Sequence, residues 1–533
     1  MIVTFTPRVT ANQGSGIGMP LFTIEEIVEV TSARVVTGEA VRRRDKVRGI
    51  TTDSRKAGRG ELFVALKGEH YNGHDFVETA LRQGAIGAIV QSAYRLPASL
   101  KGETVDSRSR MSRTSISPAH PERAEPRSVP KRPVILAVQD PLLAYQQLAT
   151  HHRLRFEIPV IAVTGSNGKT STKEMVARVL EERWNVLTTE GNLNNRIGVP
   201  QTLLRLTAAH QAAVIEMGVD RKGQTTRLAE ITRPTIGIIT NIGSDHLEFF
   251  RTLDDSAQAK GELLDLMEAE QAVVLNADDP FFEYLAARSR CRVVSFGLSP
   301  KAQVRAVDTA ADQRGTSFRL VMPGKTKPTP TAIHAFGLHN VSNALAAAAV
   351  GQVCGLSGLS IARGLSHFRP AAMRSQVEVS GEITIINDCY NANPSSMKAA
   401  IDLLSDLGSR GRTFAVVGDM LELGPEGPGL HRDVGAYLAR KGIAWLIACG
   451  TLGKEFAEGA VGAGMDANRI RRVADAAEAG ELILSLVCES DVVLIKASRG
   501  MRMEHVVEAL RNRSSTGSAG RRALRAVRKG RTR

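Results

Sequence analysis

Cysteine, aromatic residues and long apolar runs are all scarce in this sequence of 533 residues. The five cysteines (Cys291, Cys354, Cys389, Cys449 and Cys488) are odd in number and scattered without metal-ligand spacing, which predicts reduced, mostly buried thiols. No uninterrupted apolar run approaches the roughly 18 to 20 residues that cross a bilayer. The N-terminus has no charged region followed by a long apolar one, so a secretory signal is not expected. These absences predict a cytoplasmic protein without a membrane span.

The net charge of +14 is concentrated in two segments. Residues 101–132 carry eight Lys/Arg against four Asp/Glu, and residues 511–533 carry nine Lys/Arg and no acid, so the rest of the chain is nearly neutral. Basic tails can bind nucleic acid through its phosphates. No aromatic residue interleaves these charges, so the stacking platform of a single-strand binder is absent. We therefore favour solvated segments and expect no nucleic-acid partner to be required.

The length predicts roughly three domains. Strand and helix patterns alternate, which indicates an α/β protein whose central sheet is parallel. One Ser-, Arg- and Pro-rich segment breaks every period and predicts a disordered insertion. The expected segments are a disordered N-terminal extension (1–20), a small α/β domain (21–150, with the insertion at about 98–132), a central domain (151–368), a third α/β domain (369–512) and a basic disordered tail (513–533).

The stretch VTGSNGKTST (163–172) resembles a nucleotide-phosphate loop with short spacing. The usual P-loop has four residues between its first Gly and the Gly-Lys pair, and here only Ser166 and Asn167 intervene. A β-rich run precedes the loop and an amphipathic helix follows it, which directs backbone N–H groups and the helix dipole at an anion. Lys169 would meet the terminal phosphates and Thr170 would ligate Mg²⁺. The alternative is a Gly-rich turn with an exposed lysine.

Ligand-type residues also follow two further predicted strands. Glu216 ends AAVIE, and Asp245 and His246 follow TIGIIT. Loops at the carboxyl ends of parallel strands line the ligand crevice of an open sheet. The alternative for Glu216 is that it caps a neighbouring helix. The alternative for His246 is that it is an ordinary surface or core residue.

Seven motifs then occur in register. They are GSNGKTST, EGNLNN, EMG, NIGSDHLEFF, AKGELL, GLHNVSNALAA and NDCYNANPSSM. In this order they resemble the Mur ligase family, over residues 21 to about 510 without the insertion. The short loop is itself the family form. The last motif, followed by GDMLELG and HRDVG, is similar to the branch that joins D-alanyl-D-alanine to UDP-N-acetylmuramoyl-tripeptide.

The resemblance implies a fold and a reaction. A small UDP-sugar-binding α/β domain, a central parallel-sheet P-loop ATPase domain and a C-terminal Rossmann-like domain are expected. The enzyme would use ATP and two Mg²⁺ ions to form an acyl phosphate, which the dipeptide amine attacks to give an amide, ADP and phosphate. The product would serve peptidoglycan synthesis, and so cell wall biogenesis, cell shape and cell division. A monomer is expected.

The resemblance also implies roles for individual residues. The catalytic set is Lys169, Lys260 and His246. The nucleotide-binding set is Gly165, Ser166, Asn167, Gly168, Lys169, Thr170, Ser171, Asn340, Asn343, Arg374 and Asp388. The metal set is Thr170, Glu216, His246 and Lys260, with Lys260 carbamylated by CO₂. The substrate set is Ser54, Arg55, Asn192, Asn195, Tyr390, Asn391, Asn393 and Ser395.

Several of these positions have structural alternatives. An unmodified Lys260 would pair with an acid such as Glu262 or Asp265. Asn340 would cap a helix, and Arg55 would form an exposed salt bridge. The polar loop at 390–395 would be a plain Asn-Pro turn.

Three rival functions also stay open. A sister Mur ligase would add the third amino acid, although YNANPSSM differs from the Tyr-Ala-His-Thr-Pro pattern that the sister resembles. A P-loop nucleic-acid ATPase would use the basic tail. A non-catalytic binding protein would retain only the fold.

Overall fold

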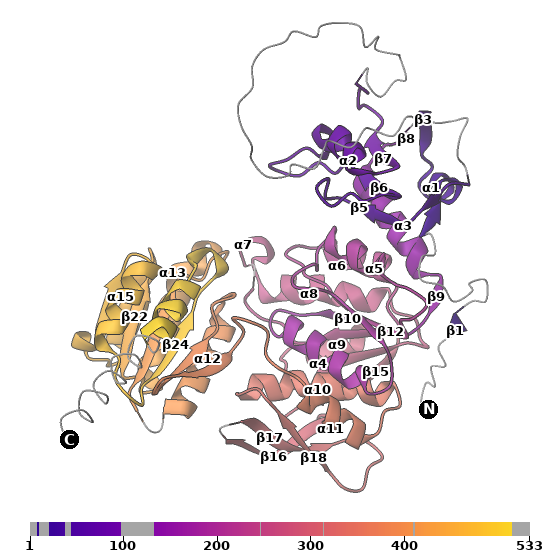
Figure 1. Cartoon of the computed structure of the whole chain (residues 1–533). Coiled ribbons are helices and arrows are strands. Elements are labelled where there is room, and N and C mark those ends of the chain that lie inside the picture. The colour runs from indigo at the N-terminus through magenta and orange to yellow at the C-terminus, as the bar shows by residue number, and fades with distance from the viewer. Residues whose placement is uncertain are drawn as a thin grey trace, which may run out of the picture.

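The computed structural model describes residues 8–9, 21–37, 44–97, 133–245, 247–312, 314–408 and 411–513. These residues form three α/β bodies in chain order, which confirms the expected fold class (Figure 1). The domain boundaries themselves stay predictions. The three segments expected to be disordered lie outside the described residues, apart from Arg8–Val9 and Arg513. None of the described helices combines the length and apolar character of a membrane span.

The first body is a five-stranded sheet with three helices. Strands run in the order β3 (Arg34–Thr37), β8 (Val134–Val138), β7 (Gly87–Gln91), β6 (Glu61–Val64) and β5 (Gly49–Thr51), and only β3 is antiparallel to its neighbour. The helices are α1 (Ile24–Thr31), α2 (Val77–Gln83) and α3 (Pro141–Arg153). Two short strand pairs join β2 (Phe22–Thr23) to β4 (Lys46–Val47), and β1 (Arg8–Val9) to β9 (Phe156–Glu157). A capping box between Thr23 and Glu26 begins α1.

The central body has a nine-stranded sheet. Its order is β11 (Val186–Thr188), β12 (Ala212–Glu216), β10 (Val160–Thr164), β13 (Ile236–Ile239), β14 (Ala272–Asn276), β15 (Arg292–Gly297), β16 (Val304–Asp312), β17 (Gly315–Val321) and β18 (Thr329–Ile333). The strands from β11 to β16 are parallel, as predicted, and β17 and β18 extend the sheet in antiparallel pairing. Strand order reverses around β10, and ligands bind at such a switch point.

Helices cover both faces of the central sheet. They are α4 (Lys169–Glu181), α5 (Gly198–Leu203), α6 (Gln224–Thr232), α7 (Leu247–Phe250), α8 (Leu253–Asp265), α9 (Phe282–Arg288), α10 (Leu338–Val353) and α11 (Gly358–Ser366). The amphipathic helix predicted after the loop is α4, and the Ala-rich helix predicted at 341–352 is α10.

The third body is a six-stranded sheet. Its order is β19 (Gln376–Ser380), β20 (Ile383–Asn387), β24 (Val492–Lys496), β21 (Thr413–Gly418), β22 (Trp445–Cys449) and β23 (Ile470–Val473). All neighbours are parallel except β19 and β20. Its helices include α12 (Pro394–Leu407), α13 (Gly427–Arg440), α14 (Gly453–Gly462) and α15 (Ala476–Leu486).

The apolar cores show how firmly the bodies are joined. One cluster runs without a break from the first body, through Phe22 and Leu148, to Ile215 and Leu263 of the central body. The third body supplies nearly all of two further clusters, one on each face of its sheet, and Leu247 of the central body joins one of them. All five cysteines are free thiols, four of them buried, as predicted. The first and central bodies therefore share a core that the third body does not enter.

Candidate active site

A cavity of about 1180 Å³ opens between the three bodies, where strands β10, β12 and β13 end. The predicted residues that line it are Ser166, Asn167, Gly168, Lys169, Thr170, Ser171, Asn192, Asn195, Glu216, Asn340, Asn343, Arg374, Asp388, Tyr390, Asn391, Asn393 and Ser395. Four predicted residues do not line this cavity: Gly165, Lys260, Ser54 and Arg55. His246 lies outside the described residues. The fold thus brings most of the candidate site to one place.

The loop between β10 and α4 has the backbone of an anion site. Gly165 has φ +134°, and a Cβ atom there would lie 2.0 Å from the Thr240 hydroxyl oxygen. Gly168 has φ +79°, and its Cβ would lie 2.3 Å from the Asn343 side-chain oxygen. Only glycine fits either position without displacing a neighbour. The resulting turn directs the first N–H groups of α4, and the positive end of its dipole, into the cavity.

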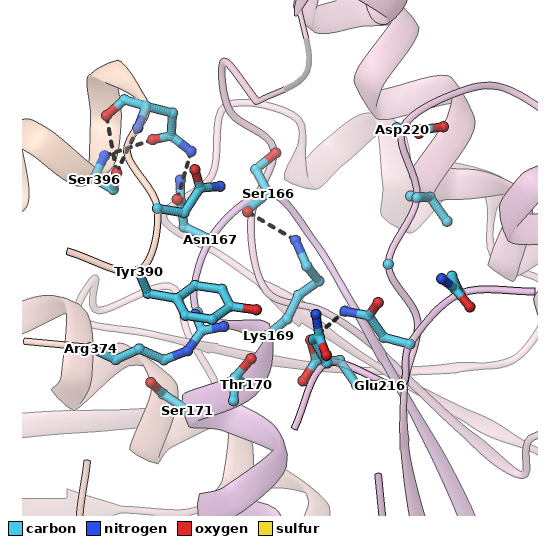
Figure 2. Close-up of a pocket in the computed structure, with 18 of the residues that line it drawn as sticks. Ser166, Asn167, Lys169, Thr170, Ser171, Glu216, Asp220, Arg374, Tyr390 and Ser396 are labelled. Atoms are coloured by element: carbon cyan, nitrogen blue, oxygen red, sulfur yellow. Dashed lines mark hydrogen bonds between the residues drawn. The ribbon is translucent and has the colours of Figure 1, made fainter. Parts of the chain in front are cut away.

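Lys169, the first residue of α4, folds back over this loop. Its Nζ donates to the carbonyl oxygen of Gly165 at 2.5 Å. It also donates to the carbonyl oxygen of Ser166 at 3.0 Å (Figure 2). Both acceptors are neutral. An ammonium bonds more strongly to an anionic oxygen than to a carbonyl, so a phosphate in the cavity would compete well for this donor.

Glu216 ends β12 and is buried, with 2% of its surface exposed. Its Oε1 accepts from the Asn194 amide at 2.8 Å, which is not the helix cap considered from sequence. Its Oε2 has no hydrogen-bond partner among the described residues, and the Lys173 ammonium lies 4.0 Å away. Thr170 is buried at the start of α4 and lines the same cavity. The Glu216 carboxylate, which has one hydrogen-bonded oxygen, and the Thr170 hydroxyl can therefore serve as hard oxygen ligands for a metal ion.

Buried Lys260 joins α8 to the loop. Its Nζ donates to Asp245 Oδ1 at 3.0 Å and to Ser256 Oγ at 2.7 Å. The same Asp245 oxygen accepts from Ser166 Oγ at 2.5 Å, so three side chains link α8 to the loop. Burial lowers the pKa of Lys260; Asp245 opposes this shift, and the charge of Lys169 adds to it. The environment therefore favours the neutral amine more than water does.

The partners expected for an unmodified Lys260 are wrong. Glu262 instead accepts from the backbone N–H and the hydroxyl of Thr226, each at 3.0 Å. Asp265 pairs with Arg288. Both acids lie on α8, but a helix turns about 100° per residue and carries them away from the buried face that holds Lys260.

The two asparagines of α10 face the loop. The expectation that Asn340 caps this helix is wrong, because Gly337 occupies the N-cap position. The Asn340 amide instead donates to the Phe336 carbonyl at 2.9 Å. Asn343 accepts from the Thr172 hydroxyl at 3.2 Å and lies beside the loop. Both asparagines therefore brace the cavity wall.

The third body contributes charged groups to the cavity. Asp388, just after β20, accepts from Lys496 Nζ at 2.6 Å and from the Ser375 backbone N–H at 2.8 Å. The Arg374 guanidinium stacks on the Tyr390 ring at 3.8 Å from the ring centroid (Figure 2). A cation held on an aromatic face beside an acid suits recognition of a planar or anionic ligand.

The polar loop before α12 reaches the phosphate loop directly. The Asn167 amide donates to Ser395 Oγ at 2.8 Å, and the Asn393 amide donates to Asn167 Oδ1 at 2.8 Å. Asn393 also caps α12 by accepting from the Ser396 N–H at 2.9 Å. Asn391 lines the cavity beside them. The Asn-Pro turn thus forms a helix cap and an interdomain contact together.

The remaining predicted substrate residues are placed differently. Arg55 pairs with Asp53 at 2.9 Å on the surface, and this hydrogen bond lowers the pKa of Asp53. Ser54 lies beside them in the chain and does not line the cavity. Asn195 accepts from the N–H groups that begin α5, whereas exposed Asn192 only lines the cavity. Roles for these residues stay predictions.

Asn194 and Lys496 are among the residues of this site that were missed from the sequence. Asn194 lies in the EGNLNN motif, but only its contact with Glu216 distinguishes it from Asn192 and Asn195. Lys496 ends the apolar strand VVLIK, and a charged residue closing a buried strand is the signal that could have found it.

Family models match three stretches of the chain. They are described as the Mur ligase family catalytic domain (residues 46–153), the Mur ligase middle domain (163–351) and the Mur ligase glutamate ligase domain (373–499). Two curated relatives are named UDP-N-acetylmuramoyl-tripeptide–D-alanyl-D-alanine ligase. The one from Bacillus subtilis is 32% identical over 87% of this chain and 93% of its own length, and the one from Escherichia coli is 34% identical over 86% and 93%. A crystal structure of MurF from Acinetobacter baumannii superimposes with a TM-score of 0.79 at 30% identity, covering 93% of this chain and all of the other.

Proposed function

Since the chain belongs to the Mur ligase family, we propose that it adds D-alanyl-D-alanine to UDP-N-acetylmuramoyl-tripeptide with ATP. The products are the pentapeptide precursor, ADP and phosphate. The carrying observation is that the loop of Lys169 and the polar loop of the third body line one cavity and are hydrogen-bonded through Asn167. ATP and the incoming amine can therefore reach the same substrate carboxylate.

The chemistry requires phosphoryl transfer first. A carboxylate resists amine attack because it is anionic and oxide is a poor leaving group. Its oxygen attacks the ATP γ-phosphorus, and the bond to the β-bridging oxygen breaks to release ADP. The dipeptide amine then attacks the acyl carbon, phosphate leaves and the amine loses a proton. Lys169 and the loop N–H groups would hold the triphosphate while charge develops.

Mg²⁺ fits the residues at the end of β12. Within the described part of the chain the Oε2 atom of Glu216 has no hydrogen-bond partner, and Thr170 lines the cavity with it. We propose that these two residues hold one ion together with phosphate oxygens and water, as Mg²⁺ prefers. Bound there, Mg²⁺ would neutralise charge on the transferred phosphoryl group. His246 stays a proposed ligand for a second ion.

We also propose that Lys260 is carbamylated. Its burial favours the neutral amine, whose nitrogen lone pair can attack CO₂ to form a C–N bond with loss of one proton. The product replaces a cation by an anion. Such a group beside Asp245 would have to be balanced by cations, which the metal ions or Lys169 would supply.

The other residues receive roles by their place in the cavity. Asn340, Asn343, Arg374 and Asp388 are proposed for the nucleotide. Asn192 and Asn195 are proposed for the peptidyl substrate, and the loop of Tyr390, Asn391, Asn393 and Ser395 for the dipeptide. Ser54 and Arg55 are proposed for the uridine diphosphate end. A cytoplasmic monomer is proposed.

One assay separates this function from its rivals. ADP release is measured with UDP-N-acetylmuramoyl-tripeptide and D-alanyl-D-alanine, using tripeptides that end in diaminopimelate or lysine, against parallel reactions with single amino acids or with DNA. We expect release and amide formation only with a tripeptide and the dipeptide together. Stimulation of ADP release by DNA alone would refute the proposal. Ligation of a single amino acid to UDP-N-acetylmuramoyl-dipeptide would refute it as well.

A further inference from the structure

The short helix α7 lies between the central and third bodies (Figure 1). Its first residue, Leu247, has 8% of its surface exposed and belongs to an apolar cluster of the third body that includes Met420, Leu423 and Ile386. Leu247 is part of the central body by chain position. A side chain of one body therefore completes the core of the other.

A backbone contact fixes the same helix. The Glu248 N–H donates to the Glu422 carbonyl at 3.0 Å. Glu422 has φ +61°, a conformation that a non-glycine residue holds only when its surroundings enforce it. Gly424 lies next to Glu248, since a Cβ atom on this glycine would be 3.4 Å from the Glu248 Cα atom. The loop of the third body that follows β21 is thus shaped to receive α7.

The other end of α7 faces the phosphate-loop network. Phe250 is buried, and Lys260 Nζ lies 4.6 Å from its ring centroid. Asp245, two residues before α7, accepts from both Lys260 and Ser166. Helix α7 therefore contacts the core of the third body at its first residue and Lys260 at its last, and Asp245, which holds the loop, lies two residues before it. Arg251 follows the helix in a left-handed conformation (φ +63°), which the surrounding structure must enforce. The backbone is therefore constrained at this end of α7 as well.

We propose that Leu247 is a positioning residue, through which seating of the third body sets the geometry of Asp245, Lys260 and Ser166. When the third body is displaced, α7 is drawn with it, and the hydrogen bonds at Asp245 are disturbed. Phosphoryl transfer then proceeds only when the body that carries the dipeptide loop is in place. This inference rests on the proposed function. It differs from the direct contact of Asn167 with Asn393 because it reaches buried Lys260.

The test compares four variants of the full chain. Leu247→Ala removes the anchor, Leu247→Val shortens it, and Leu247→Met conserves its volume. Leu438→Ala damages the same apolar cluster from α13, a helix of the third body. We expect Leu247→Ala to lower kcat about ten- to a hundredfold, since small misplacements of reacting groups cost that much. Leu247→Val should fall between Leu247→Ala and the natural protein.

Three further readouts exclude a merely structural effect. KM for UDP-N-acetylmuramoyl-tripeptide should stay unchanged, because the first body is untouched. Leu247→Met should keep kcat within about twofold of the natural value. Leu438→Ala should also keep the natural kcat when it is assayed at temperatures below the melting temperature of that variant. Amide hydrogen exchange in residues 165–171 should accelerate in Leu247→Ala and not in Leu438→Ala.

Equal losses in Leu247→Ala and Leu438→Ala, or natural kcat in Leu247→Ala and Leu247→Val, would overturn the coupling. If Leu247→Ala fails to fold, Leu247→Val against Leu247→Met decides in the same way. An inactive natural protein would instead refute the proposed function, and the exchange comparison would still decide whether α7 couples the bodies.

Discussion

Lys169 and Lys260 are joined through Ser166 and Asp245, but the protein treats their charges differently. Lys169 lines the cavity and donates to neutral carbonyl oxygens. Lys260 is fully buried, and among the described residues its only carboxylate partner is Asp245, which also accepts from Ser166. The first is suited to bind an anion and the second to change its own protonation or covalent state.

Lys169→Ala should abolish acyl-phosphate formation and leave the fold intact. Removing a positioned cation from phosphoryl transfer costs on the order of 10³-fold in rate. The hydrogen bonds of Lys169 to described residues are to loop carbonyl oxygens, where water can replace it. ADP release with the tripeptide substrate and no dipeptide measures the half-reaction, and the melting temperature is the control. Retained ligation would contradict this role.

Lys260→Ala should lower kcat at least about a hundredfold if the carbamate acts near the phosphates. Added short-chain carboxylic acids should restore part of the activity by occupying the space beside Asp245, and the natural enzyme should depend on bicarbonate. Mass spectrometry of the native protein tests the modification itself. Normal activity of Lys260→Ala without added acid would disprove it.

Sequence motifs predicted many of the residues that line the cavity but not their contacts. Glu216 and Lys169 were found because strand ends and glycine-rich turns leave a local pattern. The pairing of Lys260 with Asp245 depends on how α8 packs against the loop, which spacing along the chain does not encode. Asn340 was misplaced as a cap because the helix begins earlier, after Gly337.

At the level of elements, buried strands were the predictable part. The runs that became β10, β12 and β13 are apolar at almost every position, as expected for parallel strands covered on both faces. The antiparallel strands β17 and β18 were not predicted, because one face is exposed and their apolar signal is halved. The four-residue α7 is too short to show a helical period.

Helix α3 gives a pH-dependent prediction. Burial lowers the pKa of His152 to about 4, although its ring nitrogen bonds the Leu206 carbonyl. The unfolded chain binds a proton near pH 6.5, so stability is complete above that pH and is lost as pH falls toward 4. The loss should reach about 2 kcal/mol by pH 5.

The measurement is urea unfolding of the natural protein and of His152→Gln at pH 7.5 and pH 5. The glutamine can still bond Leu206 but does not titrate, so its free energy of unfolding should change less between the two pH values. Equal pH dependence in both proteins would show that His152 is not the titrating group.

In the whole molecule, the first two bodies share one apolar cluster, whereas the third is held by α7, the loop before α12 and short connections. The third body is therefore the one expected to move. Its presence was predictable from a second strand–helix alternation, but its placement was not, because the few contacts that fix it come from residues far apart in the sequence.

ATP with UDP-N-acetylmuramoyl-tripeptide should compact the protein in solution scattering. Closure excludes water, which would otherwise hydrolyse the acyl phosphate. The radius of gyration is compared with and without both ligands, with Lys169→Ala as the control that should not respond. An unchanged scattering envelope in the natural protein would argue against closure.

The shared cavity has a consequence for inhibitor design. Lys169 of the central body and Tyr390 of the third line the same space, so one molecule can reach both. A compound that links a triphosphate mimic to a dipeptide mimic would bind its second half at high effective concentration, and gain affinity without new contacts. Because such a compound would bind both bodies at once, it would also hold the third body in one position relative to the central body.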